Sequence, residues 1–447
     1  MARFESAYRQ VGLLSLGVVA ALLTACGGGG GGTGDMGGTP TGPVVASQAG
    51  PVAVTLPAYG GYAYWMAYQD GDGPWQVAAR SNGGFSFQVK DKAGKYAVML
   101  VAESNSPNTS DMPPEVMAFH LTRAETATID LSRRNDPGRM DYTAVRFTQQ
   151  GAPASGTCAV ALGSLAPSPG SCDTLNQSRY SVPKDRMDAF AVHLNASGAA
   201  DSLVIQRDLD MRSITEVNFD FAKAIALPAP SQTSTLTDYT PVAGETLAVG
   251  ATLNSPSASI RLAADSQTSL SYPLVPAGVL GSNDSYRVSA TARLVQGNVT
   301  ARRSASYVSV SGAVQPLKLP TYANPLALGA APNGSGPRPT LTWTPVAGST
   351  LTNVYAWEKS GIGPTLDYTF SAGWIGGART VSYTSPELAG LGWKPSWNLR
   401  RQTAMVVYYT ENFTNRATPA YFAGMPPEKV EDHSDWFSQI RTEVPIP

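Results

Sequence analysis

The sequence predicts an all-β protein made of Ig-like sandwich domains in tandem. From Val52 onward, short apolar segments alternate with turn residues and recur about every 8 to 15 residues. Only 15% of the residues are charged, so surface helix formers are scarce, whereas the chain holds 44 Gly and 34 Pro. Since 447 residues exceed one domain core, we expect three or four domains. The net charge of -1 disfavours nucleic-acid binding.

Residues 1–25 have the pattern of a secretory signal peptide. Arg3 and Arg9 precede an apolar run from Val11 to Leu23. This run is shorter than the roughly 20 residues of a permanent membrane-spanning helix, and it fits the apolar region of a cleaved signal. We therefore expect the chain to be exported.

The apolar run ends in a motif that resembles the lipobox of bacterial lipoproteins, Leu23-Thr24-Ala25-Cys26. This resemblance implies that cleavage leaves Cys26 as the first residue and that its acyl chains anchor the protein in a membrane. An ordinary signal with an incidental cysteine is the alternative. Gly27 stands where, in some lipoproteins of this type, an Asp signals retention at the inner membrane. We therefore expect display at the outer membrane or the cell surface.

Residues 26–47 are predicted to form the lipidated cysteine and a flexible tether. Six consecutive glycines at 27–32 are followed by further Gly and Pro residues, so no core can form there. A flexible coil of about 20 residues reaches roughly 25 Å. The chain has no cationic excess, so the lipid and not basic side chains is expected to hold it at the membrane.

Residues 48–135 are predicted to form the first β-sandwich. Seven apolar runs have strand length, which is the number a small sandwich needs. They are Val52–Leu56, Tyr62–Tyr68, Gln76–Arg80, Phe85–Val89, Tyr96–Ala102, Met117–Leu121 and Thr126–Leu131. The segment Asp70-Gly71-Asp72-Gly73-Pro74 favours a hairpin turn. A calcium loop is the alternative, but it needs six or more oxygen ligands, which are not visible locally.

Residues 140–228 are predicted to form a β domain with a disulfide. Cys158 and Cys172 are the cysteines that remain after Cys26, and they lie 14 positions apart. In an exported chain such a pair favours a disulfide, which stabilises by about 3 kcal/mol for a loop of this size. Two buried free thiols are the alternative.

Residues 230–318 and 319–447 share an internal repeat. The segment Thr235–Leu247 recurs as Thr340–Leu351 around a common Thr-Pro-Val-Ala-Gly, and the offset is the size of one sandwich domain. A strand, this turn and a second strand resemble the opening hairpin of fibronectin type III-like modules. The resemblance implies two related sandwiches. Near the end of the chain, Asp435–Ile440 is expected to form a helical turn.

Aromatic residues are the candidate ligand-binding side chains. Tyr and Trp cluster in the first domain, and six of the eight Trp lie in 319–447. Exposed aromatic rings stack on sugars or anchor protein partners, whereas packing in a core is the alternative. The candidates are Tyr62, Tyr64, Trp65, Trp75, Trp374, Trp393 and Trp397.

Signatures of catalysis and cofactor binding are missing from the sequence. It holds three His in separate segments, and no pair has the spacing of a zinc site. We also find no nucleophile elbow and no phosphate-binding loop. The leading hypothesis is therefore a lipid-anchored envelope protein that acts in binding, adhesion or spacing, without cofactor, metal or nucleic acid and with an envelope glycan or protein as partner. The alternatives are a carbohydrate-binding protein using the C-terminal aromatics and an envelope hydrolase with a Ser-His-Asp triad from distant strands.

Overall fold

The protein folds almost entirely into β-strands, which confirms the predicted all-β class. The computed structural model describes residues 48–56, 62–79, 83–104, 113–131, 142–163, 169–172, 179–331, 337–361, 363–400, 403–414 and 433–446. The predicted signal peptide, Cys26 and the tether lie outside the described residues. The few helical turns within the described residues are η2 (Phe221–Lys223), η3 (Ala277–Val279), α2 (Ala372–Ile375), η4 (Ala389–Leu391) and η5 (Pro395–Trp397).

The first seven strands form a sandwich. A sheet of order β4-β1-β7 faces the strands β6-β5-β2-β3. In β1, Val52 and Val54 are buried between exposed neighbours, as expected for a strand with one face on a core. The strands are β1 (Gly50–Thr55), β2 (Tyr62–Asp70), β3 (Gln76–Val77), β4 (Gly84–Val89), β5 (Lys95–Ser104), β6 (Glu115–Thr122) and β7 (Thr128–Asp130).

The predicted hairpin after β2 is confirmed. Strands β2 and β3 pair antiparallel, and the amide of Gly73 donates to the carbonyl of Asp70 at 2.9 Å. The carboxylate of Asp70 accepts from the backbone amides of Lys90 and Asp91 at 2.9 and 3.0 Å. Asp70 therefore closes the turn and fixes it to the connection between β4 and β5.

The second set of strands repeats the topology of the first. Its sheets have the orders β10-β8-β13 and β14-β12-β11-β9. If the two-residue β3 is set aside, both sandwiches place their first strand between the third and the sixth, and the first and sixth run parallel. The strands are β8 (Tyr142–Gln150), β9 (Thr157–Leu162), β10 (Arg179–Pro183), β11 (Arg186–Leu194), β12 (Ala200–Asp210), β13 (Glu216–Asp220) and β14 (Ile225–Ala226).

The last two sets of strands share a different topology. A small sheet, β15-β18, faces β17-β16-β19-β20, and β21-β22-β25 faces β24-β23-β26-β27 in the same order. The repeated Thr-Pro-Val-Ala-Gly turn joins β15 to β16 and β22 to β23. The first set is β15 (Gln232–Thr235), β16 (Thr246–Asn254), β17 (Ser259–Asp265), β18 (Ser269–Tyr272), β19 (Ser285–Gln296) and β20 (Val299–Ser309). The second set is β21 (Ala327–Ala331), β22 (Arg338–Trp343), β23 (Leu351–Glu358), β24 (Thr365–Ser371), β25 (Val381–Thr384), β26 (Thr403–Thr414) and β27 (His433–Ile446).

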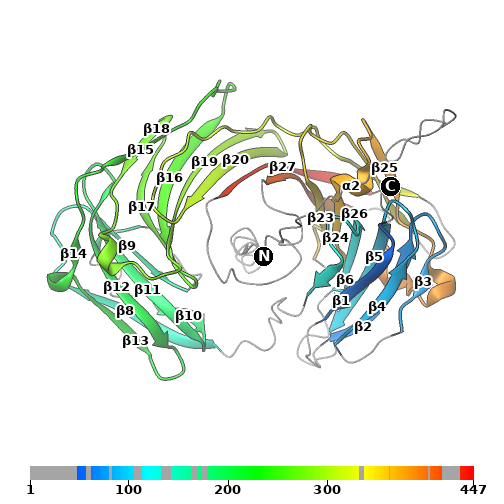
Figure 1. The fold of residues 1–447 in the computed structure, drawn as a ribbon, viewed down its shortest axis with the longest axis horizontal. Helices are drawn as coiled ribbons and strands as arrows, with labels where there is room; N and C mark the ends of the chain where they lie inside the picture. Colours follow the sequence, from blue (N-terminus) through cyan, green and yellow to red (C-terminus); the bar gives the residue numbers. More distant parts are fainter. Residues whose placement is uncertain are drawn as a thin grey trace, which may run out of the picture.

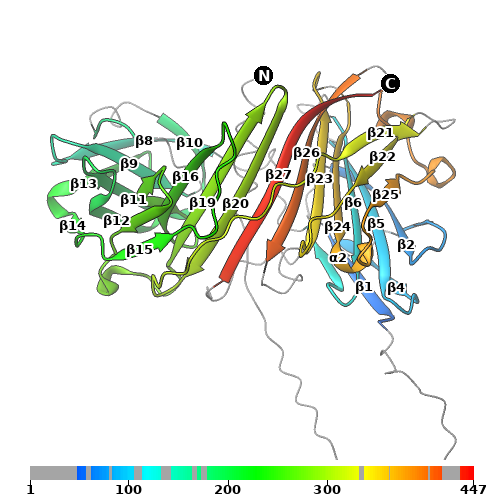
Figure 2. The same cartoon turned by 90° about the horizontal axis from the view of Figure 1, so that it is seen from above.

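Three of these four-stranded sheets join edge to edge into one sheet of twelve strands. Strand β20 pairs antiparallel with β27, and β24 pairs parallel with β6. The predicted segments 48–135, 230–318 and 319–447 therefore share one sheet. Figures 1 and 2 show the result as an arch, with β19, β20, β27 and β26 across its top.

The arch has two lobes, each with a core that crosses two sets of strands. The first lobe consists of β1–β7 and β21–β27, and its strand β5 is buried on both faces. Val98 faces the core of the first sandwich, and Met99 faces a core shared with Trp343 and Tyr409. In the second lobe, β8–β20, Phe190 of β11 shares a core with Leu262 of β17. Both lobes are therefore continuous packing units.

The prediction of a helical turn at Asp435–Ile440 is wrong. These residues lie within β27, a strand that hydrogen-bonds to β20 on one side and to β26 on the other. Ser438 and Ile440 point to one face and are buried, while Gln439 points to the other face. Two long neighbouring strands provide hydrogen-bond partners for the backbone of β27. Strand pairing therefore overrides the local preference of these residues for a helical turn.

Candidate functional site

Three of the predicted aromatics meet where the segment before β26 packs on β2. The ring centroids lie 5.4 Å apart for Trp65 and Trp393, 5.6 Å for Trp65 and Trp397, and 5.3 Å for Trp393 and Trp397. The indole nitrogen of Trp65 donates to the carbonyl of Leu391 at 3.0 Å. Trp397 is only 2% exposed. The three indoles thus pack β2 against the segment before β26, which lies more than 300 positions later in the sequence.

Glu103 of β5 adds an electrostatic contact to this cluster. Its carboxylate accepts from the indole nitrogen of Trp397 at 2.6 Å and from the ammonium of Lys394 at 2.5 Å. The Lys394 ammonium also lies 5.2 Å from the ring centroid of Trp397. Burial alone would raise the pKa of Glu103, but the hydrogen bonds from Lys394 and Trp397 lower it. The cluster is therefore a junction within the first lobe.

The other predicted aromatics lie outside this cluster of three indoles. Trp75 is half-buried against the core shared by β5 and β26, and Tyr64 is half-buried against the core of the first sandwich. Trp374 lies 4.8 Å from the ring of His120. Tyr62 begins β2, and its side chain lies outside the described residues. Ligand binding by the seven predicted aromatics stays a prediction.

His120 is a buried histidine among aromatic rings. Its ring stacks on Phe370 at 4.7 Å and contacts the ring of Tyr383 at 4.7 Å. Neither ring nitrogen has a hydrogen-bond partner among the described residues, and the side chain is 1% exposed. Burial lowers the pKa of His120 to about 3, so the ring is neutral at neutral pH.

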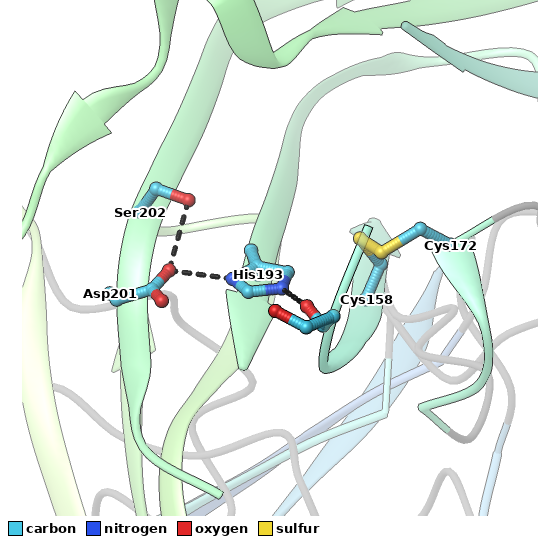
Figure 3. The surroundings of a disulfide bond; sticks show 6 residues. Cys158, Cys172, His193, Asp201 and Ser202 are labelled. Carbon is cyan, nitrogen blue, oxygen red and sulfur yellow. Dashed lines mark hydrogen bonds and ion pairs between the residues drawn. A yellow bond between two sulfur atoms is a disulfide. The ribbon is translucent and has the colours of Figure 1, made fainter. Parts of the chain in front are cut away.

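The predicted disulfide between Cys158 and Cys172 is present, and a second histidine lies beside it (Figure 3). Cys158 of β9 is directly opposite His193 of β11. The chain before β9 approaches the imidazole closely at Gly156, which has a φ of 95° and where a Cβ atom would come within 2.6 Å of Nε2. Only glycine fits this approach without strain.

The surroundings of His193 are not those of a catalytic triad. Its Nδ1 lies 2.7 Å from a carboxylate oxygen of Asp201, and Nε2 contacts the carbonyl oxygen of Ser155. The hydroxyl of Ser202 donates to Asp201 at 3.2 Å and does not face the imidazole (Figure 3). A triad needs a hydroxyl at the second ring nitrogen, whereas His193 meets a backbone carbonyl there. This cluster therefore fixes the chain next to the disulfide.

The second candidate site is the inner face of the twelve-stranded sheet, defined as the face opposite the small sheets β15-β18 and β21-β22-β25. Figure 1 shows these small sheets on the outside of the arch. In β23, Val354 and Ala356 point to the core, so Tyr355 and Trp357 point to the inner face. Trp357 stacks on Tyr408 of β26 with the ring centroids 5.4 Å apart.

A band of amide and hydroxyl side chains runs beside these rings. Gln439 of β27 donates to the hydroxyl of Thr410 at 3.0 Å. Asn412 donates to Asn353 at 2.7 Å, and Asn353 donates to Thr369 at 2.8 Å. These bonds cross four neighbouring strands from β27 to β24. The inner face therefore combines aromatic rings with groups that donate and accept hydrogen bonds.

Sequence reasoning missed this inner face. Tyr355, Tyr408 and Phe437 are not among the predicted aromatics. The signal is the period of two, since Tyr355 lies between the buried Val354 and Ala356 and Tyr408 lies between the buried Val407 and Tyr409. Phe437 belongs to the stretch that was assigned to a helical turn, so its face could not be inferred.

No group of three or more His, Cys, Asp or Glu side chains along the described part of the chain is arranged to hold a metal ion. Among the same residues, no helix has the length and apolar character needed to span a membrane.

The comparisons with known proteins give weak likenesses. No protein-family model and no curated protein matches the sequence. A solved tetra-tandem repeat from the extending region of a large adhesion protein is 11% identical, with a TM-score of 0.14, and the match covers 81% of this chain and 95% of the other. The outer membrane protein OmpT of Vibrio cholerae is 8% identical, with a TM-score of 0.11, covering 90% and 100%. TM-scores this low carry no argument about the fold or function of this chain.

Proposed function

We propose that this chain is a lipid-anchored protein of the bacterial cell envelope that acts, without catalysis, as an adhesion or spacer module. The observation that carries this proposal is β27, which hydrogen-bonds to the second lobe through β20 and to the first lobe through β26. A spacer must keep its shape under load, and two long ladders on one strand resist relative motion of the lobes.

The contacts around β27 support a rigid connection. Its ladder with β20 runs from His433 to Arg441, and its ladder with β26 extends over Asp435–Ile446. The hydroxyl of the fully buried Ser438 accepts from the amide of Ala323 at 2.7 Å, which fixes the segment that connects the lobes. Buried hydrogen bonds of this kind are costly to break.

The strand order supports the proposed resemblance of the last two units to fibronectin type III-like modules. In each unit the repeated turn leads from a small sheet into a four-stranded sheet, with the same order of strands. Domains of this kind are used in many proteins as repeated structural units. We therefore assign to these units the joining of the two lobes.

The anchor rests on the lipobox at Cys26. Residues 27–49 separate it from the start of β1 at Gly50. A flexible segment of about 20 residues would hold the arch within roughly 25 Å of the membrane. Two or three acyl chains give stable anchoring, which a single chain does not.

The test is covalent labelling in the cell. Radiolabelled palmitate is expected to enter the wild-type protein and to be lost in a Cys26→Ser variant. A variant with both Cys158→Ser and Cys172→Ser keeps the lipobox and is the matched control, which should label like the wild type. An unlabelled wild-type protein, or undiminished labelling of Cys26→Ser, would contradict the anchoring proposal.

A further inference from the structure

The inner face of the second lobe carries arginines in two groups, one on β17 and β19 and the other on β19 and β20. In β19, Tyr286, Val288 and Ala292 belong to the core, so the residues that alternate with them along the strand, Arg287 and Arg293 included, point to the inner face. The arginines on this face are Arg261 of β17, Arg287 and Arg293 of β19, and Arg302 of β20. Within the described ranges, no carboxylate forms an ion pair with any of the four.

Two of these arginines are directly opposite each other. Arg293 and Arg302 are register partners in the β19–β20 ladder. Like charges at opposite positions destabilise a strand pair. Burial, together with the positive charge of Arg293, lowers the pKa of Arg302. The repulsion between the two guanidinium groups therefore opposes folding in the free protein. An anion placed between the two groups would remove this repulsion.

Two arginines on other surfaces of this lobe are neutralised by carboxylates. Arg303, the neighbour of Arg302 on the same strand, points to the opposite face and donates to Glu245 at 3.0 Å. Arg207 donates to Asp188 and Asp284 at 3.0 and 3.1 Å. Arg302 and Arg303 are neighbours on one strand and therefore differ: the guanidinium that points outward has a carboxylate partner, and the one that points inward has none among the described residues.

Aromatic rings lie beside Arg302 and continue along this face into the first lobe. The guanidinium of Arg302 lies 5.1 Å from the ring centroid of Phe437. Arg441 lies 6.0 Å from that of Tyr408, which stacks on Trp357. Register partners Arg302 and Gln439 place the amide band directly beside the arginines. Positive charge, aromatic rings and amides thus occupy one continuous sheet face.

We propose that this inner face, from Arg261 to Trp357, binds an extended chain of an acidic polysaccharide. Its carboxylates pair with Arg293 and Arg302, its hydroxyls bond to the amide band, and its sugar rings pack on the aromatic side chains. Single-stranded nucleic acid is also anionic and stacks on rings. The band of amides and hydroxyls matches the many hydroxyls of a sugar chain and therefore favours the polysaccharide. The proposal rests on the binding role inferred above and assigns it a site and a ligand class.

The test measures binding of polygalacturonate oligosaccharides to the full chain in detergent by titration calorimetry. We expect binding that weakens as salt rises. The double variant Arg293→Gln with Arg302→Gln should lose at least tenfold in affinity. Arg212→Gln, in an exposed turn of the second sandwich, is the control and should bind like the wild type.

Thermal unfolding without ligand separates binding from folding. The double variant removes the repulsion between Arg293 and Arg302, so its melting temperature should equal or exceed that of the wild type. Absence of polygalacturonate binding by the wild type, equal affinity of the double variant, or tighter binding of neutral dextran oligosaccharides or oligodeoxynucleotides would each overturn the proposal. Palmitate labelling of Cys26 is independent of these results, so failure here is distinguishable from failure of the anchoring proposal.

Discussion

The carboxylate of Glu245 accepts hydrogen bonds from the guanidinium of Arg303 at 3.0 and 3.1 Å, on the outer face of β20. The Glu245 side chain is fully buried and that of Arg303 is 12% exposed. The hydroxyls of Tyr239 and Tyr322 donate to the same carboxylate. Since Tyr322 precedes β21, this single group ties the repeated turn to the connection between the lobes.

Replacing Glu245 by Gln is predicted to destabilise the protein by about 3 kcal/mol, because it leaves Arg303 without its charge partner in a largely buried position. Urea unfolding at neutral pH measures this. Burial would raise the pKa of Glu245, but the bonds from Arg303 and Tyr322 lower it. Its contribution is therefore present above the ordinary pKa of Glu and lost as the pH falls below it. Lys318→Gln, which breaks an exposed pair with Asp238, is the control and should change stability little.

Glu411 occupies the comparable place in the second copy of the repeat, but without an arginine. Ser349 replaces Glu245 in the repeated motif, and its hydroxyl donates to Glu411, as do the hydroxyls of Thr352 and Tyr409. No Lys or Arg within the described ranges forms an ion pair with it. Burial raises the pKa of Glu411. The two copies therefore hold the same turn with different charge chemistry.

Glu411→Gln is predicted to cost less stability than Glu245→Gln at neutral pH, because burial already disfavours the charged form. With the folded pKa raised, the contribution of Glu411 is complete below the ordinary pKa of Glu and decreases as the pH rises through the raised value. Urea unfolding between pH 4 and 8 should show this decrease in the wild type and not in the variant. A larger cost for Glu411→Gln than for Glu245→Gln at neutral pH would refute this assignment.

The buried His120 is predicted to make the fold acid-sensitive. Burial lowers the pKa of His120 to about 3, so between about 6.5 and 3 the unfolded chain binds a proton that the folded chain does not. Stability should therefore fall with decreasing pH in this window, by about 1.4 kcal/mol per pH unit from this group. In His120→Phe the slope from this group disappears. Equal slopes in both proteins would show that the ring is protonated when folded.

The disulfide is predicted to stabilise the second sandwich by about 3 kcal/mol, as expected for a closed loop of 14 residues. Urea unfolding with and without a reductant measures this difference. The variant carrying Cys158→Ser and Cys172→Ser should match the reduced wild type and be insensitive to the reductant. If reduction leaves the unfolding midpoint unchanged, the disulfide does not constrain the unfolded chain as assumed.

Local pattern was enough to predict the strands and the disulfide but not the joining of the sheets. Val52 and Val54 alternate with exposed neighbours, so β1 is visible in the sequence. The partners of β27, by contrast, cannot be inferred from the sequence. Its residues carry no turn signal and no strict alternation, and Trp436 and Phe437 fit a helix as well as a strand. Its pairing with β26 and with β20, which lies more than 120 positions earlier, decides the outcome.

The repeated topology of the first two sandwiches also could not be predicted from the sequence. The last two units share a motif of about a dozen residues, whereas β1–β7 and β8–β14 share only the order and direction of their strands. The sequence also did not determine whether each predicted aromatic side chain points to a core or to the surface. Trp65 and Trp397 pack together across more than 300 positions, and a contact of this kind leaves no local periodicity.

The central claim is that β27 holds the two lobes as one body. Spin labels at Lys92→Cys in the first lobe and Arg212→Cys in the second, both exposed, report the distance between them by double electron–electron resonance. Cys158 and Cys172 are bridged, so they do not take up label. The account predicts one narrow distance distribution, which broadens in a chain ending at residue 432 that lacks β27. A broad or multiple distribution in the full chain would contradict it.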